Sequence, residues 1–306
     1  AGDTTQFINY YAENGFGSSQ FYTVMEDHEH NLWFGTPGKG ARKLMSEDLL
    51  SYDKSQGLLN EVAISLTQDP FGRFFIGTIN GLSIFHENHF QSYTDADGLA
   101  GTEIWDVLID SSGIIWLATN NGLQMLIPQN YFVLYRNKNY KEAQKIQNLI
   151  KQSRKIKDFY SVDLVHYPDL SGSRVVDLFM DDRQRIWYAS SDKGLGRIIV
   201  NAAGELQIRV YTAQDGLNTN NVWCTYQDRR HRFWVGTIGG GLSLYNEETD
   251  RFYSFTRAEG LADDVALTLC EDLKGNLWVG SERGITRIDI NKVPALTPGA
   301  NFDLHA

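Results

Sequence analysis

The sequence predicts an all-β fold assembled from six copies of one antiparallel unit. The first observation is an Asp followed six residues later by a large aromatic residue, at Asp27/Trp33, Asp69/Phe75, Asp110/Trp116, Asp181/Trp187, Asp228/Trp234 and Asp272/Trp278. The second is that each aromatic is followed by an apolar residue, then Gly or Ala, then Thr or Ser. Successive aromatics are 42, 41, 71, 47 and 44 residues apart. Self-similarity at such a period indicates one supersecondary unit repeated along the chain.

The copy at residues 265–290 shows which strands make up one unit. Residues 265–269 form a short apolar run, residues 277–280 carry the repeated aromatic, and residues 285–290 alternate apolar and polar side chains. Such runs, separated by turns that contain Asp, Gly and Asn, are typical of β-strands. Earlier copies add a fourth strand, such as residues 252–255. Four antiparallel strands in about 42 residues, repeated, are typical of a β-propeller blade.

The two ends of the chain complement each other. The last copy has three strands, and residues 7–11 have the composition of an isolated fourth strand. Pairing them would close a ring and remove two exposed sheet edges. We therefore expect one domain over residues 1–306, a six-bladed β-propeller with four-stranded antiparallel blades that is closed by the N-terminal strand. The expected repeats lie near residues 19–60, 61–101, 102–136, 171–217, 218–261, and 262–291 plus 5–16.

One segment, residues 137–170, interrupts the repeat pattern after a fourth strand expected at Tyr131–Tyr135. Within it, residues 139–157 hold six basic residues and one acidic residue, and their apolar residues fall on one helical face. This pattern predicts a helical insertion. The helix would either pack by its apolar face on the rim or end of the propeller, or serve as a basic docking element for a partner or an acidic ligand.

Composition limits the classes of function. The net charge of −10 argues against nucleic acid as a partner. Mean hydropathy is −0.35 and no apolar run approaches 18 residues, so no membrane span is expected in this chain. No signal peptide is expected at its start, although a precursor could have lost one. Cys224 and Cys270 are expected to be buried small hydrophobes, since two thiols make no disulfide framework.

Several motifs resemble a known repeat family. The run Asp272–Gly280 (DLKGNLWVG), the run Asn31–Thr36 (NLWFGT) and linkers such as Asp97–Leu99 (DGL) are similar to the two-component regulator propeller repeat. The resemblance covers nearly the whole chain except about residues 137–170. It implies the periplasmic input region of a bacterial membrane sensor, whose output is usually a histidine kinase or a diguanylate cyclase. Many such sensors respond to oligosaccharides.

The chain also departs from that family. Its proteins commonly show more than six repeats, and the basic insertion is not part of their pattern. Output domains and membrane helices are absent from this sequence. The resemblance therefore implies an excised or partial sensor region, and it does not supply the identity of the ligand.

Sequence motifs for catalysis or metal binding are weak. His28, Glu29 and His30 resemble a metal pair, and His231 occupies the matching turn of another copy, but a zinc site needs three or four converging ligands. We expect these to be turn residues. The sequence contains no nucleophile elbow and no P-loop. The repeated Asp is expected to form turns, so we predict no catalytic residue, no metal and no cofactor.

The first strand of each copy carries two sets of candidate residues. Four residues before the repeated Asp stand small or polar residues that would line the axis, including Asp106 and Asp177 in consecutive copies. Close carboxylates would raise one pKa or attract a cation, whereas water in the channel could instead solvate both. One residue further along, the set from Val24 to Leu269, which includes Thr225, is expected in the core.

The mouth of the channel, where the first strands begin, gathers aromatic and polar residues. The predicted ligand-binding residues are Tyr22, Glu103, Trp105, Arg174, Asn221 and Trp223. Aromatic faces stack on sugar rings, and carboxylate, amide and guanidinium groups bond hydroxyls, so this set suits sugar recognition. The alternative is that the aromatics only fill the space between blades.

Taken together, these features predict a non-enzymatic, ligand-sensing periplasmic propeller. It would bind a small molecule or a partner protein and pass the event to its own membrane-linked output domain. Two alternatives stay open. One is a lyase resembling the virginiamycin-inactivating propeller enzymes, and the other is a protein-interaction scaffold that uses the basic helix.

Overall fold

The structure is a computed structural model that describes residues 13, 15–45, 48–128, 160–164, 170–200 and 206–293. These residues form six antiparallel sheets, the blades of a six-bladed β-propeller. Helical structure in the described ranges is limited to short 3-10 turns. The predicted all-β fold class is confirmed.

Blades 1 to 3 come first in the chain, and the strands of each sheet are neighbours in chain order. Blade 1 contains β1 (Thr23–Glu26), β2 (Leu32–Gly35), β3 (Ala41–Met45) and β4 (Asp48–Tyr52). Blade 2 contains β5 (Ala63–Gln68), β6 (Phe74–Thr78), β7 (Gly81–His86) and β8 (His89–Tyr93). Blade 3 contains β9 (Ile104–Ile109), β10 (Ile115–Thr119), β11 (Gly122–Pro128) and β12 (Tyr160–Leu164).

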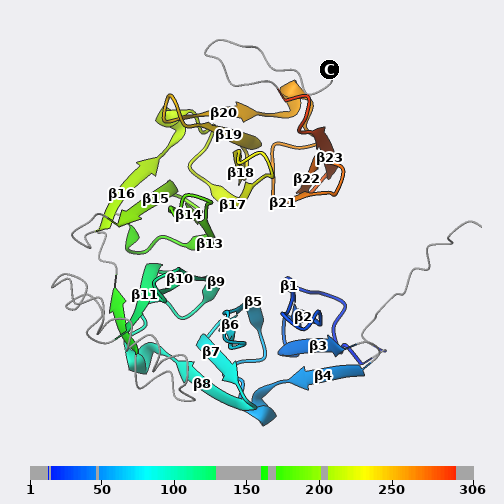
Figure 1. The fold of residues 1–306 in the computed structure, drawn as a ribbon, viewed down its shortest axis with the longest axis vertical. Coiled ribbons are helices and arrows are strands. Elements are labelled where there is room, and N and C mark those ends of the chain that lie inside the picture. Colours follow the sequence, from blue (N-terminus) through cyan, green and yellow to red (C-terminus); the bar gives the residue numbers. More distant parts are fainter. Residues whose placement is uncertain are drawn as a thin grey trace, which may run out of the picture. The chain divides into compact units, whose positions relative to one another are not determined.

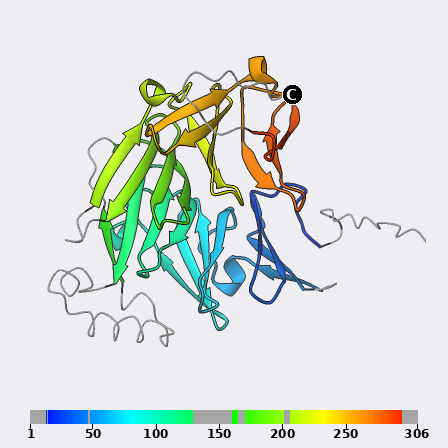
Figure 2. The same ribbon diagram turned by 45° about the horizontal axis from the view of Figure 1, so that its top comes forward.

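Blades 4 to 6 repeat the same order. Blade 4 contains β13 (Val175–Met180), β14 (Ile186–Ser190), β15 (Gly194–Val200) and β16 (Leu206–Tyr211). Blade 5 contains β17 (Val222–Gln227), β18 (Phe233–Thr237), β19 (Leu242–Asn246) and β20 (Arg251–Phe255). Blade 6 contains β21 (Thr268–Glu271), β22 (Asn276–Ser281) and β23 (Gly284–Asp289). Figure 1 labels these strands, and Figure 2 shows those of blade 4 alongside one another.

The fourth strand of blade 3 differs from the sequence prediction. We expected it at Tyr131–Tyr135, before the insertion, but β12 at Tyr160–Leu164 pairs with β11 in the blade 3 sheet. The insertion therefore begins within blade 3, between its third and fourth strands, rather than after the blade. Residues 129–159 lie outside the described residues, as does the expected helix at 139–157.

The chain divides into two compact units, residues 1–107 with 148–160 and residues 108–147 with 161–306. Blades 1 and 2 belong to the first unit and blades 4 to 6 to the second, while β9 spans the boundary. Residues 7–11 lie outside the described residues, so their pairing with β23 stays a prediction.

The repeated Asp organises an identical turn between the first and second strands of every blade. In blade 5, the backbone N–H of Asp228 bonds the Arg232 carbonyl, and the N–H of His231 bonds the Asp228 carbonyl. The carboxylate of Asp228 accepts the backbone N–H of Arg230 and Arg232 through Oδ1. The third residue after the Asp has a positive φ in all six turns, at His30, Gly72, Gly113, Gln184, His231 and Gly275.

The same carboxylate explains the six-residue spacing to tryptophan. Nε1 of Trp234 donates to Oδ2 of Asp228 at 2.8 Å, and the other four repeated tryptophans bond their own Asp at 2.8–2.9 Å. Blade 2 has Phe75 and no indole donor, and there Arg73 donates to Asp69 as Arg185 and Arg232 donate to their own Asp beside the indole in blades 4 and 5. One aspartate therefore satisfies the turn and the buried indole N–H together.

Within each unit, repeated aromatics fill the spaces between consecutive blades, as predicted for Trp33 and Trp187. Trp33, Trp116, Trp187 and Trp234 are at most 1% exposed, whereas Trp278 is half-buried. In the first unit the ring of Trp33 lies 4.2 Å from that of Phe74 in the next blade. In the second unit Trp187 stacks on Phe233 at 4.4 Å.

The small residue after each aromatic allows this close approach. A Cβ added to Gly77 would lie 2.4 Å from the Ile104 carbonyl oxygen of the next blade, and one on Gly236 would lie 2.7 Å from the Ala266 carbonyl oxygen. Contacts shorter than 3.0 Å are not tolerated there, because a backbone carbonyl cannot move aside as a flexible side chain can.

A hydrogen bond also joins the turns of consecutive blades within each unit. The N–H of the residue after the Asp donates to a Gln or Glu side chain that ends the first strand of the next blade. These bonds run from His28 to Gln68, from Asp182 to Gln227 and from Arg229 to Glu271, each at 2.9 Å. They fix the order and register in which neighbouring blades pack.

We expect Trp234→Ala to lower the free energy of unfolding by roughly 3–5 kcal/mol, because it leaves a large cavity between blades 5 and 6. Trp278→Ala is the matched control and should cost clearly less, since that indole is half-buried. Urea denaturation followed by circular dichroism measures both. Equal losses, or a smaller loss for Trp234→Ala, would contradict the packing role.

The buried carboxylates also predict acid sensitivity. Burial acts to raise the pKa of Asp27, but the hydrogen bonds from Trp33 and Asn31 outweigh it and hold that pKa well below its usual value. Stability from such a group is present above the unfolded-state pKa of about 3.9 and is lost as the pH falls toward the folded-state value. Urea unfolding between about pH 6 and 2.5 should show this loss, and Asp27→Asn should flatten it. An unchanged pH profile in the variant would refute this account.

Candidate functional site

The beginnings of the first strands, where the channel mouth was predicted, contain backbone irregularities in three blades. The pairing register between first and second strands shifts at Ala63/Ser65, at Val175/Asp177 and at Val222/Cys224. The bulged residues are thus Ile64, Val176 and Trp223. Bulges often re-aim a side chain next to a functional site. All three occupy the repeat position from which the predicted mouth aromatics were drawn.

In the second unit, three of the predicted residues lie at the same end of contacting strands. Arg174 is exposed and directly precedes β13, while Asn221 directly precedes β17 and Trp223 is its second residue. β13 packs against β17. Trp223 and Asn221 are both half-buried, so each side chain is partly accessible to a ligand while its neighbours hold it in place.

Asn221 has a polar atom that the described protein leaves without a partner. Its backbone carbonyl accepts the N–H of Ile238 at 2.9 Å, and its own N–H donates to Oγ1 of Thr219. Its side-chain Oδ1 is buried and has no hydrogen-bond partner among the described residues. An unsatisfied acceptor at the same end of these strands as Arg174 and Trp223 is suited to a ligand that supplies a donor.

The other three predicted residues belong to the first unit. Tyr22 is 57% exposed and directly precedes β1, where its N–H bonds the carbonyl of Gly35. Glu103 precedes β9 and Trp105 is its second residue, and both are half-buried. The predicted set is therefore divided between the units, and its convergence into one site stays a prediction.

The two channel aspartates have different surroundings. Oδ1 of Asp106 accepts the N–H of Val107 at 2.8 Å. Oδ2 of Asp177 accepts a hydrogen bond from Oγ1 of Thr225, in the next blade, at 2.5 Å. Because Asp106 and Asp177 lie in different units, their pairing stays a prediction.

Three expectations about side-chain burial are wrong. Thr225 is only half-buried and bonds Asp177 instead of packing in the core, and Val24 is 62% exposed on β1. Cys270 is exposed on β21. Cys224 is half-buried, and burial together with the Asp177 carboxylate raises the pKa of its thiol. Both cysteines are free thiols.

His28, His30 and His231 lie at the opposite ends of the blades, in the Asp turns. Nδ1 of His30 contacts the Glu26 carboxylate, and Nδ1 of His231 lies 2.5 Å from Oδ2 of Asp182. Within the described ranges no group of three His, Cys, Asp or Glu residues could hold a metal ion. These residues serve the turns, as the sequence indicated.

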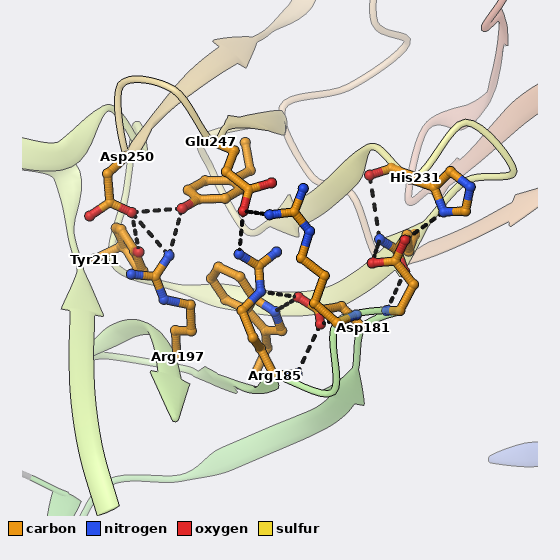
Figure 3. A network of polar contacts seen from close by, with 12 residues as sticks. Asp181, Arg185, Arg197, Tyr211, His231, Glu247 and Asp250 are labelled. Atoms are coloured by element: carbon orange, nitrogen blue, oxygen red, sulfur yellow. Dashed lines mark hydrogen bonds and ion pairs between the residues drawn. The ribbon is translucent and has the colours of Figure 1, made fainter. Parts of the chain in front are cut away.

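Sequence reasoning missed a polar network between blades 4 and 5, shown in Figure 3. Asp250, in the turn between β19 and β20, accepts hydrogen bonds from the hydroxyls of Tyr211 and Tyr245, each at 2.6 Å. Nη1 of Arg197 donates to the same carboxylate at 3.1 Å and to Tyr245. Burial raises the pKa of Tyr211, and its bond to Asp250 raises it further.

A second part of this network surrounds the repeated Asp of blade 4. Nε of Arg185 donates to Asp181 at 2.6 Å, and its Nη1 donates to Glu247 of blade 5 at 2.7 Å. Arg183 also bonds Glu247. The charged groups of this network pair with one another and join blades 4 and 5, so its role is structural. The sequence did carry a signal for this network. An Arg stands four residues after the repeated Asp in three blades, at Arg73, Arg185 and Arg232.

Family comparison agrees with the repeat. Three segments, residues 15–38, 98–121 and 216–239, match the family described as Two component regulator propeller. Each segment begins at a linker glycine and runs through the Asp turn and the aromatic into the next turn. The resemblance that the sequence motifs indicated is confirmed. No curated protein sequence matches the chain significantly.

Solved structures share the fold. The extracellular domain of the putative hybrid two component system BT3049 from B. thetaiotaomicron is 18% identical, with a TM-score of 0.50 over 88% of this chain and 39% of that chain. PorZ of the type-IX secretion system of Porphyromonas gingivalis is 14% identical, with a TM-score of 0.62 over 87% and 38%. Virginiamycin B lyase from Staphylococcus aureus is 10% identical, with a TM-score of 0.59 over 88% and 84%. This chain thus spans about two fifths of the first two proteins.

Proposed function

We propose that this chain is the ligand-binding propeller of an extracytoplasmic signal-transduction protein. The two-component regulator repeats support the class of protein, and the extracellular domain of a hybrid two component system shares the fold. Among the described residues, no helix has the length and apolar character needed to cross a bilayer. The output domain to which the propeller reports would be supplied outside this chain.

The observation that carries the proposal is the contrast between the two ends of each blade. At the Asp-turn end, charged groups such as Arg185, Asp181 and Glu247 satisfy one another. At the mouth end, Trp223 sits on a bulge beside Asn221, whose Oδ1 is buried without a partner among the described residues. Variable residues displayed on a rigid scaffold are the usual location of binding function.

The chemistry of the mouth residues favours a ligand with hydroxyls and an apolar face. Trp223 offers a ring face for stacking, Asn221 an acceptor, and Arg174 a set of donors. An oligosaccharide fits this combination. We assign no catalytic role to this chain.

Isothermal titration calorimetry with a panel of neutral and acidic oligosaccharides tests the proposal. Trp223→Ala should weaken binding about 5- to 100-fold, because stacking on one aromatic ring contributes on the order of 1–3 kcal/mol. Arg174→Ala should also weaken it. Circular dichroism should show unchanged folding, since both side chains are at least partly exposed.

Arg183→Ala is the matched control for Arg174→Ala. Arg183 belongs to the same blade and is exposed, but it lies in the Asp turn at the opposite end. Its removal should leave affinity unchanged. Binding that survives in both Trp223→Ala and Arg174→Ala, or that falls in Arg183→Ala, would place the site elsewhere.

A further inference from the structure

In blades 2 and 6, one position of the third strand bonds the linker that enters the blade, and blade 1 differs at this position. In blade 2, Oγ of Ser83 accepts the N–H of the linker residue Leu59 at 3.0 Å. In blade 6, Oγ1 of Thr286 accepts the N–H of Ala262 at 2.8 Å. Blade 1 has Arg42 at this position, since Arg42, Ser83 and Thr286 each pair with the residue that follows the repeated aromatic.

The linker that enters blade 1 also differs from those that enter blades 2 and 6. Gly17 stands where blades 2 and 6 have Leu59 and Ala262, and its φ of +65° lies in the left-handed region. A Cβ added to Gly17 would lie 3.5 Å from Nη2 of Arg42 and 3.4 Å from Cγ of Lys39. These are ordinary contact distances, so the positive φ is what favours glycine here, and they place Arg42 and Lys39 directly beside the linker.

Arg42 is a buried cation that forms no salt bridge with any residue that the structure describes. It is 7% exposed, and its Nε donates to the Phe16 carbonyl at 3.2 Å. Its Nη1 is buried and has no hydrogen-bond partner among the described residues. Burial lowers the pKa of Arg42, and the more distant Asp53 carboxylate opposes this only in part.

The arginines of the Asp turns, in contrast to Arg42, have a carboxylate partner. Arg73, Arg185 and Arg232 each donate to the repeated Asp of their own blade. A buried guanidinium nitrogen without a hydrogen-bond partner is unfavourable, so the Nη1 of Arg42 calls for an explanation.

We propose that Arg42, with Lys39 and the backbone of Gly17, forms a subsite for an oxyanion group of a ligand, a carboxylate, sulfate or phosphate. The Nη groups of Arg42 that Phe16 does not engage would donate charge-assisted hydrogen bonds to such a group, and the Lys ammonium adds charge. Lys39 belongs to the turn between β2 and β3, at the end of blade 1 where Tyr22 lies. The subsite is independent of Arg174 and Trp223 and does not rest on the function proposed above.

The test uses the full chain and thermal unfolding in sodium sulfate, phosphate or acetate, each compared with sodium chloride at equal ionic strength. The wild type should show a saturable rise in Tm of about 3 °C or more with at least one oxyanion, because ligands that bind only the folded state stabilise it. The three salts distinguish which oxyanion the subsite prefers.

Arg42→Met separates a binding role from a structural one. Methionine removes the unpaired charge and keeps an apolar stem, so the variant in chloride should melt at or above the wild-type Tm. Its response to oxyanions should vanish, and Lys39→Ala should show a weaker response than the wild type. Arg287→Met, on the exposed face of blade 6, is the control and should respond as the wild type does.

Two results would overturn the proposal. An equal rise in Tm for the wild type and Arg42→Met would show a general salt effect instead of a site. A wild type that does not respond, together with a lower Tm for Arg42→Met in chloride, would show that Arg42 only anchors the linker. Neither result bears on oligosaccharide binding by Trp223, so the two proposals fail separately.

Discussion

The hydrogen bond from the tryptophan indole to the aspartate six residues before it is the constraint on which each blade depends. A buried indole must donate its N–H, and a turn between two short strands must satisfy its own backbone N–H groups. In blade 5 the single carboxylate of Asp228 meets both demands, with Oδ1 bonded to the turn and Oδ2 to Trp234. Blade 2 keeps the carboxylate although it has no indole, and Arg73 donates to it as Arg185 and Arg232 do in blades that keep the tryptophan.

This constraint separates the two ends of the blades into different roles. At the Asp-turn end the same bonds recur, and neighbouring blades are joined by contacts such as Asp182 to Gln227. That end has little freedom to vary. At the other end the repeat requires only a linker and a short turn, so Trp223, Arg174 and Arg42 can differ from blade to blade. Departures from a repeated local rule are expected where function is placed.

The period, the aromatic positions and the small residue after each aromatic were sufficient to predict the blades, because each reflects packing between sheets. The fourth strand of blade 3 was missed, since the runs at 131–135 and 160–164 have similar strand-like composition and composition does not choose between them. The bulges at Ile64, Val176 and Trp223 share no residue type, so no sequence signal marks them. Arg42 was missed because a charged residue in a strand normally indicates an exposed face, and here it is buried.

A double-mutant cycle between Asp228 and Trp234 tests the central claim most directly. Asp228→Ala, Trp234→Phe and the double variant would be unfolded in urea, and the cycle cancels the separate costs of the turn and of the smaller ring. A hydrogen bond to a buried carboxylate predicts a coupling free energy of about 1.5–3 kcal/mol. Effects that add to within about 0.5 kcal/mol would show that the aspartate and the tryptophan act independently, and the account of the blade would be wrong.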